Sequence, residues 1–210
     1  MNKLKSIFVV NRYYFIVYSL FLFTGLIFLV KAGKAASFVY LNPYHQTALD
    51  TFFANFTLLG DGVFPVVIFI VLLCMRRFFQ ASQLMTAFLL SALLTQILKN
   101  VFSMPRPKQF FIPGQYPYFI EGITHTGFSS FPSGHSTSIF ALATILALFA
   151  KDKKWNVAYL LGAVAVGYSR IYLGQHFLGD VLVGSFIGMM TAVLVHWLFP
   201  SKFQRLRGFA

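Results

Sequence analysis

Long apolar stretches, separated by short polar connections, dominate the pattern along the chain. A helix needs about 20 apolar residues to cross a bilayer, and most of these stretches approach that length. Residues 47–59 look amphipathic instead, which predicts a short helix at the membrane interface. The pattern therefore predicts an all-α polytopic membrane protein with six transmembrane helices. These are expected at residues 13–30, 63–75, 82–98 and 135–150, from residue 155 to at least 167, and at 177–199.

Composition supports a membrane location. Hydrophobic residues make up 58% of the chain and charged residues only 10%, with a mean hydropathy of +0.72. A soluble domain of this size cannot hide that much apolar surface. The first apolar stretch follows basic residues and lacks a small-residue cleavage site, so we expect an uncleaved first helix. The loop sizes leave room for a single domain over residues 1–210, with its core at about 82–199.

The distribution of positive charge predicts the orientation. The net charge is +12, but the basic residues cluster at the ends of apolar segments, which argues against nucleic-acid binding. The side that holds the termini is the richer in lysine and arginine, so the positive-inside rule places the termini in the cytoplasm. The basic residues on that side are Lys3, Lys5, Arg12, Arg76, Arg77, Lys151, Lys153, Lys154, Lys202, Arg205 and Arg207.

Candidate chemistry gathers before the last apolar segment. His176 and Asp180 are four residues apart, so on a helix they would share a face. A carboxylate can then hold one imidazole nitrogen and leave the other free to attack. Arg170 is expected just beyond the end of the preceding helix. An activated histidine beside a guanidinium suits a substrate that is both electrophilic and anionic, such as a phosphate ester.

Two further motifs are predicted on the same membrane surface, opposite the termini. Lys99 precedes Arg106-Pro107 after the third span, and Pro132-Ser133-Gly134-His135 opens the fourth. Ser133 can cap that helix, and Gly134 allows the backbone to approach a ligand closely. The N-terminus of a helix favours an anion.

Together the three motifs read K-x6-RP, PSGH and SR-x5-H-x3-D, and they resemble the type 2 phosphatidic acid phosphatase superfamily of membrane lipid phosphatases. The resemblance covers about half the chain. It implies that His176 attacks phosphorus to form a phosphohistidine, that Asp180 orients His176, and that His135 acts as acid and then base. The implied phosphate-binding residues are Lys99, Arg106, Ser133, Gly134 and Arg170. No metal or other cofactor is expected, because three cations replace the Mg²⁺ of other phosphoryl-transfer sites.

The expected function is hydrolysis of a lipid phosphomonoester or pyrophosphate at the outer face of a bacterial cytoplasmic membrane. By resemblance the substrate is undecaprenyl pyrophosphate, phosphatidylglycerol phosphate, phosphatidic acid or a lipid A phosphate. The expected partners are this substrate and membrane lipids, with no obligate protein partner. Two alternatives stay open: phosphotransfer to a lipid acceptor, and transport of a small anion or lipid. The transporter is disfavoured because the chain has no internal repeat and its charges gather at one face.

Other polar residues have simpler interpretations. His45 and His196 are expected to be packed or interfacial, whereas Glu121 and His125 in the long loop are weaker acid–base candidates. The loop aromatics Tyr116, Tyr118 and Phe119 fit either an interfacial belt or an acyl-chain entrance. Asp61 is expected to cap the second span. Gly184 and Gly188 predict close helix packing.

Overall fold

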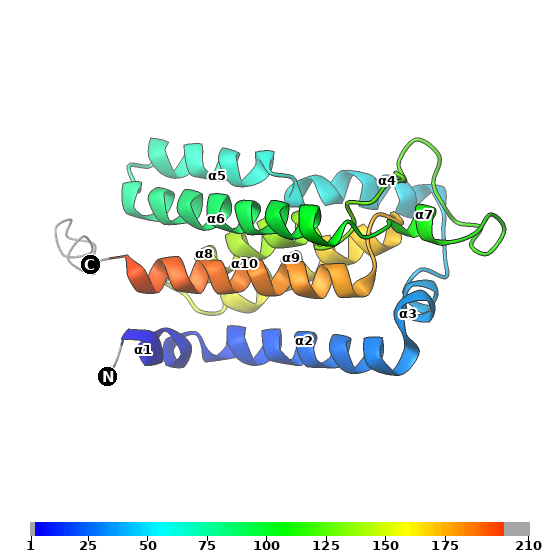
Figure 1. Cartoon of the computed structure of the whole chain (residues 1–210). Helices are drawn as coiled ribbons and strands as arrows, with labels where there is room; N and C mark the ends of the chain where they lie inside the picture. The colour runs from blue at the N-terminus through cyan, green and yellow to red at the C-terminus, as the bar shows by residue number, and fades with distance from the viewer. Residues whose placement is uncertain (1–2, 200–210) are drawn as a thin grey trace.

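The computed structural model describes residues 3–199, and every regular element in that range is a helix. The helices form an elongated bundle, with both described ends of the chain at the same end (Figure 1). Lys202, Arg205 and Arg207 lie outside the described residues. The elements are α1 (Lys3–Val10), α2 (Arg12–Ala32), α3 (Lys34–Leu41), α4 (Thr47–Phe56), the 3₁₀ turn η1 (Thr57–Gly60), α5 (Val63–Cys74), α6 (Phe78–Phe102), α7 (Pro107–Phe110), α8 (Gly134–Phe149), α9 (Trp155–Tyr172) and α10 (Leu178–Leu198).

Helix α8 forms the centre of the bundle, where it packs against α6, α9 and α10. Its contact with α10 is made at glycines. A Cβ atom on Gly184 would lie only 2.5 Å from the carbonyl oxygen of Ser133, and one on Gly188 would clash with the carbonyl oxygen of Thr137. The predicted close packing at Gly184 and Gly188 is therefore confirmed. We call this contact the α8–α10 seam.

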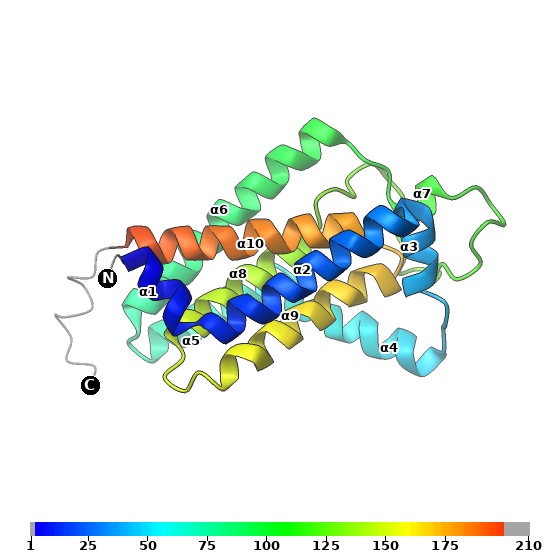
Figure 2. The ribbon, with the colours of Figure 1, turned by 90° about the horizontal axis from the view of Figure 1, so that it is seen from below.

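Three helical segments are long and apolar enough to cross a membrane: Arg12–Ala32, Phe78–Phe110 and Leu178–Leu198. A fourth candidate is the bent pair Thr47–Gly60 and Val63–Cys74, and α8 is apolar but shorter. Figure 2 shows α6 diverging from α10 toward the end that carries α7. The all-helical membrane fold is confirmed, whereas the count of six spans stays a prediction.

The segment expected as a separate interfacial helix is arranged differently. Helix α4 and η1 continue into α5 through a bend of 54°. Gly60 allows the bend to lie against the bundle core, since a Cβ atom there would be 3.0 Å from the Cβ atom of His135. The Asp61 carboxylate accepts a hydrogen bond from the Val63 N–H at 3.2 Å, so Asp61 caps α5 as expected, although Gly62 occupies the N-cap position itself.

The long connection between α6 and α8 lies at the end opposite the termini (Figure 1). It folds back on itself through two backbone hydrogen bonds. The Arg106 N–H donates to Gly127 at 2.8 Å, and the Ser130 N–H donates to Met104 at 3.0 Å. These bonds bring the segment after Lys99 beside the segment before Ser133, so two motifs that are distant in the sequence meet in one loop.

Two expectations about the third motif were wrong in detail. Helix α9 runs to Tyr172, so Arg170 lies in its last turn rather than beyond it. Helix α10 begins at Leu178, so His176 precedes the helix and shares no helical face with Asp180. The cause is a tight turn at Gly174, whose φ of +64° is accessible mainly to glycine.

Candidate active site

The turn from Arg170 to His176 places the candidate nucleophile beside the end of α9. The N–H groups of Gln175 and His176 both donate to the Arg170 carbonyl, at 3.0 and 3.1 Å. The Gly174 N–H donates to Ile171 at 2.9 Å. These bonds fold the chain back on itself, so Arg170 and His176 lie close together without belonging to one helix.

Asp180 reaches back from the first turn of α10 toward His176. Its Oδ2 atom lies 3.5 Å from Nδ1 of His176, which is long for a hydrogen bond. The same oxygen accepts hydrogen bonds from the Phe177 N–H at 2.9 Å and the Ser130 hydroxyl at 2.5 Å. Catalytic hydrogen bonds are often long before substrate binds. Asp180 is therefore fixed by two donors, in a position to orient His176.

The second motif is joined to the third by backbone. The Ser133 N–H donates to the Asp180 carbonyl at 3.0 Å. The Ser133 side chain accepts from the Ser136 N–H at 3.3 Å, so the predicted helix cap is confirmed. The His135 ring makes no hydrogen bond to another described residue. Its Cβ atom lies against Gly60, and Arg170 and His176 lie within electrostatic reach of the ring, so the ring is available to a substrate.

Arg170 is buried, with 7% of its surface exposed, yet its hydrogen bonding is incomplete. Its Nη1 atom donates to the Thr57 hydroxyl in η1 at 2.7 Å. Its Nε atom is buried and has no partner within residues 3–199. A buried donor without an acceptor costs about 1–3 kcal/mol. An anionic ligand would supply the missing acceptor.

The other two cations are held by the long loop. Lys99 Nζ donates to the Ser129 carbonyl at 2.5 Å. Arg106 donates through Nη1 to Gln175 Oε1 at 2.5 Å and through Nη2 to the Ser129 hydroxyl at 3.4 Å. Gln175 in turn donates to the Ile123 carbonyl at 2.5 Å. The loop thereby connects the first motif to the residue that precedes His176.

The three cations form an unbalanced positive cluster. Lys99, Arg106 and Arg170 lie within electrostatic reach of one another, whereas two carboxylates act on them: Asp180 on Lys99 and Arg106, and Asp61 on Arg170. Lys99, Arg106 and Arg170 also act on His135. Within residues 3–199, no three His, Cys, Asp or Glu residues are grouped so that they could hold a metal ion. The cluster suits a doubly charged anion such as a phosphate ester.

Burial determines the charge of His176, whose surface is 2% exposed. Loss of solvation lowers its pKa to about 4, although Asp180 opposes this shift. The imidazole is therefore neutral near pH 7. A neutral imidazole is the form that can act as a nucleophile.

The other histidines and Glu121 do not join this cluster. His196 is hydrogen-bonded to Gln83, at 2.9 Å, near the end of the bundle that holds the termini. Glu121 and His125 are exposed on the loop and make no hydrogen bond to a candidate site residue in the described chain. His45 lies in a separate polar cluster.

Four contacting residues escaped the sequence reasoning: Thr57, Ser129, Ser130 and Gln175. Ser129 and Ser130 lie just before the second motif and Gln175 lies inside the third, so their positions offered a weak signal. Thr57 offered none, because its contact with Arg170 depends on the bend that brings η1 against α8 and α9. The glycines at the bend were the nearest indication.

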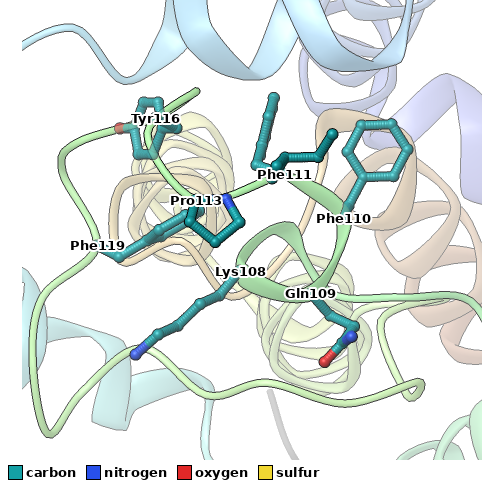
Figure 3. A pocket seen from close by; sticks show the side chains of 8 residues that line it. Lys108, Gln109, Phe110, Phe111, Pro113, Tyr116 and Phe119 are labelled. Atoms are coloured by element: carbon teal, nitrogen blue, oxygen red, sulfur yellow. The ribbon is translucent and has the colours of Figure 1, made fainter.

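A pocket of about 520 Å³ opens in the loop beyond the catalytic groups (Figure 3). Its walls include Phe110 and Phe111, whose rings lie 5.3 and 6.3 Å from that of Phe177. Of the other loop aromatics, Tyr116 is buried and Tyr118 is exposed. The candidate catalytic residues do not line this pocket. The full lining is Lys108, Gln109, Phe110, Phe111, Ile112, Pro113, Tyr116 and Phe119.

Comparison with curated proteins finds bacterial lipid phosphatases. The lipid A 1-phosphatase of Rhizobium etli is 33% identical over 117 residues, which cover 54% of this chain and 49% of that protein. Phosphatidylglycerophosphatase B of Bacillus subtilis is 32% identical over 143 residues, covering 63% and 64%. The matched region spans about half the length of the first of these relatives.

Solved structures show the same fold. The crystal structure of Aquifex aeolicus LpxE superimposes with a TM-score of 0.67 at 30% identity, covering 78% of this chain and 94% of that one. A transmembrane PAP2 type phosphatidylglycerolphosphate phosphatase from Bacillus subtilis gives 0.64 at 24% identity over the whole of both chains. The model of the PAP2 superfamily matches residues 80–204, which contain all three motifs. The chain therefore belongs to the PAP2 superfamily, as the motifs predicted.

Proposed function

We propose that the protein hydrolyses a phosphomonoester or pyrophosphate bond of a membrane lipid, without a metal ion. The observation that carries this proposal is the gathering of three cations around the buried His176 and its carboxylate partner Asp180: Arg106 and Arg170 act on His176, and Lys99 acts on Asp180. The unpartnered Nε atom of Arg170 supports an anionic ligand at this place. Phosphoryl transfer needs positioning and neutralisation of charge, and this cluster can supply both.

In the first step, Nε2 of His176 attacks phosphorus while the bond from phosphorus to the lipid oxygen breaks. Protonated His135 gives its proton to that leaving oxygen. Asp180 stabilises the positive charge that develops on the imidazole. The products are a phosphohistidine at His176 and the lipid alcohol, or the lipid monophosphate if the substrate is a pyrophosphate.

In the second step, neutral His135 takes a proton from a water molecule, whose oxygen attacks phosphorus. The bond between phosphorus and Nε2 breaks and inorganic phosphate leaves, which restores His176. Lys99, Arg106 and Arg170 would bind the equatorial oxygens in both steps. The backbone at Ser133 and Gly134 would contribute N–H donors at the start of α8.

The names of several relatives support the substrate class that we propose. These relatives act, by name, on lipid A phosphates, phosphatidylglycerophosphate and undecaprenyl diphosphate. These lipids share a phosphate or diphosphate at the membrane surface, and phosphatidic acid has the same chemistry. The substrate is proposed as a member of this class.

The proposed topology has six spans, with the termini in the cytoplasm and the site facing the exterior of a bacterial cytoplasmic membrane. Lys3 Nζ donates to the carbonyls of Trp197 and Phe199, at 2.6 and 2.5 Å. The start of α1 therefore lies beside the end of α10. The active site lies at the opposite end of the bundle (Figure 1). Basic residues are concentrated near the chain termini and in the connections expected on the same side of the membrane, which supports this orientation.

The test is release of phosphate from a panel of lipid phosphates by the purified protein in detergent, with EDTA present. We expect release by the wild type and a loss of at least about 10⁴-fold in His176→Ala, since removing a nucleophile leaves only binding. His125→Ala is the matched control, because that histidine is exposed and should be dispensable. Release by His176→Ala at the wild-type rate would refute the nucleophile. Phosphate that appears on a second lipid instead of in solution would indicate phosphotransfer.

A further inference from the structure

A second polar cluster lies outside the catalytic groups, where the connection between α3 and α4 crosses the end of α9. His45 is its centre. Its Nε2 atom lies 2.8 Å from Asn42 Oδ1, and its Nδ1 atom lies 3.1 Å from Asp50 Oδ1. The Tyr172 hydroxyl donates to the same Asp50 oxygen at 2.6 Å. We call these four residues the α9 joint.

The His45 ring is fully engaged. It stacks on the ring of Tyr172 at 4.4 Å and on that of Tyr118 at 5.3 Å, with interplanar angles of 26° and 11°. Both faces are therefore covered and both nitrogens have partners. A histidine in this state is not available as a nucleophile or a metal ligand. Its contribution is to hold the neighbouring segments in place.

Asn42 transmits that contribution to the catalytic turn. It is completely buried, and its Nδ2 atom donates to the carbonyls of Ile171 and Tyr172, at 3.0 and 3.1 Å. The last carbonyls of a helix lack partners within the helix and need external donors. These two carbonyls lie between Arg170 and His176 in the sequence. The α9 joint therefore holds the turn that carries both groups.

Hydrogen bonds join His45 to Asn42 and Asp50. Since the amide of Asn42 faces two carbonyls, its Oδ1 atom is the acceptor toward His45. The Asp50 carboxylate is also an acceptor, so the His45 ring bridges Asn42 and Asp50 through its two nitrogens. The stacked rings of Tyr172 and Tyr118 hold the imidazole in that orientation. The charged and polar groups facing His45 are Asn42 after α3, Asp50 in α4, Tyr118 in the loop and Tyr172 at the end of α9.

We propose that Asn42, His45, Asp50 and Tyr172 are positioning residues that fix the turn from Arg170 to His176 for phosphoryl transfer. The inference rests on the proposed phosphatase function. Besides the bonds within the turn, the Thr124 hydroxyl, which donates to the Leu173 carbonyl at 2.9 Å, also anchors this segment. Loosening the joint would leave the turn in place but less well aligned, and misalignment of about 1 Å costs roughly 100-fold in rate.

The test uses the full chain in lipid nanodiscs with a lipid phosphate that the wild type hydrolyses. Tyr172→Phe removes one hydroxyl and keeps the ring stack, so the variant should fold. We expect kcat to fall about tenfold with KM within about twofold, because alignment rather than binding is lost. Asp50→Asn should give a similar loss. The double variant should lose no more than either single one, since both changes open the same joint.

Tyr118→Phe is the matched control. It makes the same chemical change on the opposite face of the His45 ring, and its hydroxyl makes no hydrogen bond to the described residues, so kcat should stay at the wild-type value. Three outcomes would contradict the proposed positioning role of the α9 joint. They are a wild-type kcat in Tyr172→Phe, equal losses of kcat in both tyrosine variants, and a loss that appears in KM instead of kcat. A wild-type protein that releases no phosphate would instead overturn the proposed function, and this inference with it.

Discussion

The two sides of the active site are held by different means. On one side, the α8–α10 seam brings Ser133, His135 and Asp180 together through contact between backbones. On the other side, Lys99 extends from the last turn of α6 and Arg106 from the loop that follows. Both are held by hydrogen bonds from the ends of their long side chains, Lys99 to the Ser129 carbonyl and Arg106 to Gln175. The candidate acid–base residue His135 and the carboxylate of Asp180 therefore stand on the rigid side, and His176 is held beside Asp180 by the turn that precedes α10. The groups that neutralise charge stand on the adjustable side.

This difference has a physical reason. In-line attack tolerates little misplacement, and a helix contact without side chains between the backbones leaves little freedom. Neutralisation of charge varies slowly with distance, so flexible cations are sufficient for it. A loop can also move aside while a lipid headgroup enters. This comparison predicts that substitutions at the α8–α10 seam reduce kcat, whereas substitutions of Lys99 and Arg106 raise KM.

The largest effect in this comparison is expected from Gly184→Val. The added side chain would collide with the Ser133 carbonyl and push Ser133 and His135 away from Asp180. We expect kcat to fall about 100-fold and the free energy of unfolding to fall by about 1–3 kcal/mol. Phosphate release and thermal unfolding in detergent would measure both quantities.

Gly162→Val is the control for that variant. A Cβ atom on Gly162 of α9 meets nothing within 4 Å, so the same substitution should change neither quantity by more than a small amount. If Gly184→Val keeps its wild-type kcat, the seam does not align the catalytic groups.

An intermediate effect is expected from Arg106→Gln on the adjustable side. The substitution removes a cation and its charge-assisted hydrogen bonds, and one hydrogen bond to a charged group is worth about 1.5–3 kcal/mol. We expect KM to rise about tenfold or more while kcat falls by less, as determined from initial rates over a range of lipid concentrations. A loss confined to kcat would show that Arg106 acts in the transition state alone, and the comparison would fail.

The smallest effect concerns pH. Because burial lowers the pKa of His176 to about 4, the folded protein should keep this imidazole neutral as the pH falls from 7 to 5.5. Nitrogen-15 chemical shifts of histidine-labelled protein would follow its protonation directly. Asp180→Asn should lower the titration point further, since the carboxylate raises the pKa. Protonation of His176 near pH 6.5 would show that the site is more hydrated than its 2% exposure indicates.

The sequence was sufficient for the helical membrane fold and the family, because both depend on local signals. Apolar stretches marked the helices, and Ser133 marked the start of α8. The three motifs identified the residues that the fold gathers at one end of the bundle. Their proposed roles stay predictions that the variants above can test.

The remaining features have two different causes. His176 and Asp180 were expected to meet on a helix, whereas they meet because the chain turns at Gly174 and Asp180 caps the start of α10, which is a local arrangement that the spacing alone does not reveal.

The other two features depend on tertiary contacts. Thr57 contacts Arg170 only because the chain bends after η1. His45 was expected to be a packed residue, and only its partners reveal a link to the catalytic turn. In both of these cases, the information lies in residues distant along the chain.

The unbalanced positive cluster also has a consequence for turnover. Inorganic phosphate, the last product, presents the same oxygens to Lys99, Arg106 and Arg170 as the lipid phosphate does. Since the buried Nε atom of Arg170 has no acceptor within residues 3–199, bound phosphate would supply one and would be retained. We expect phosphate to compete with the lipid and its departure to limit the rate once chemistry is fast. The cations that assist cleavage would then also set the time between one turnover and the next.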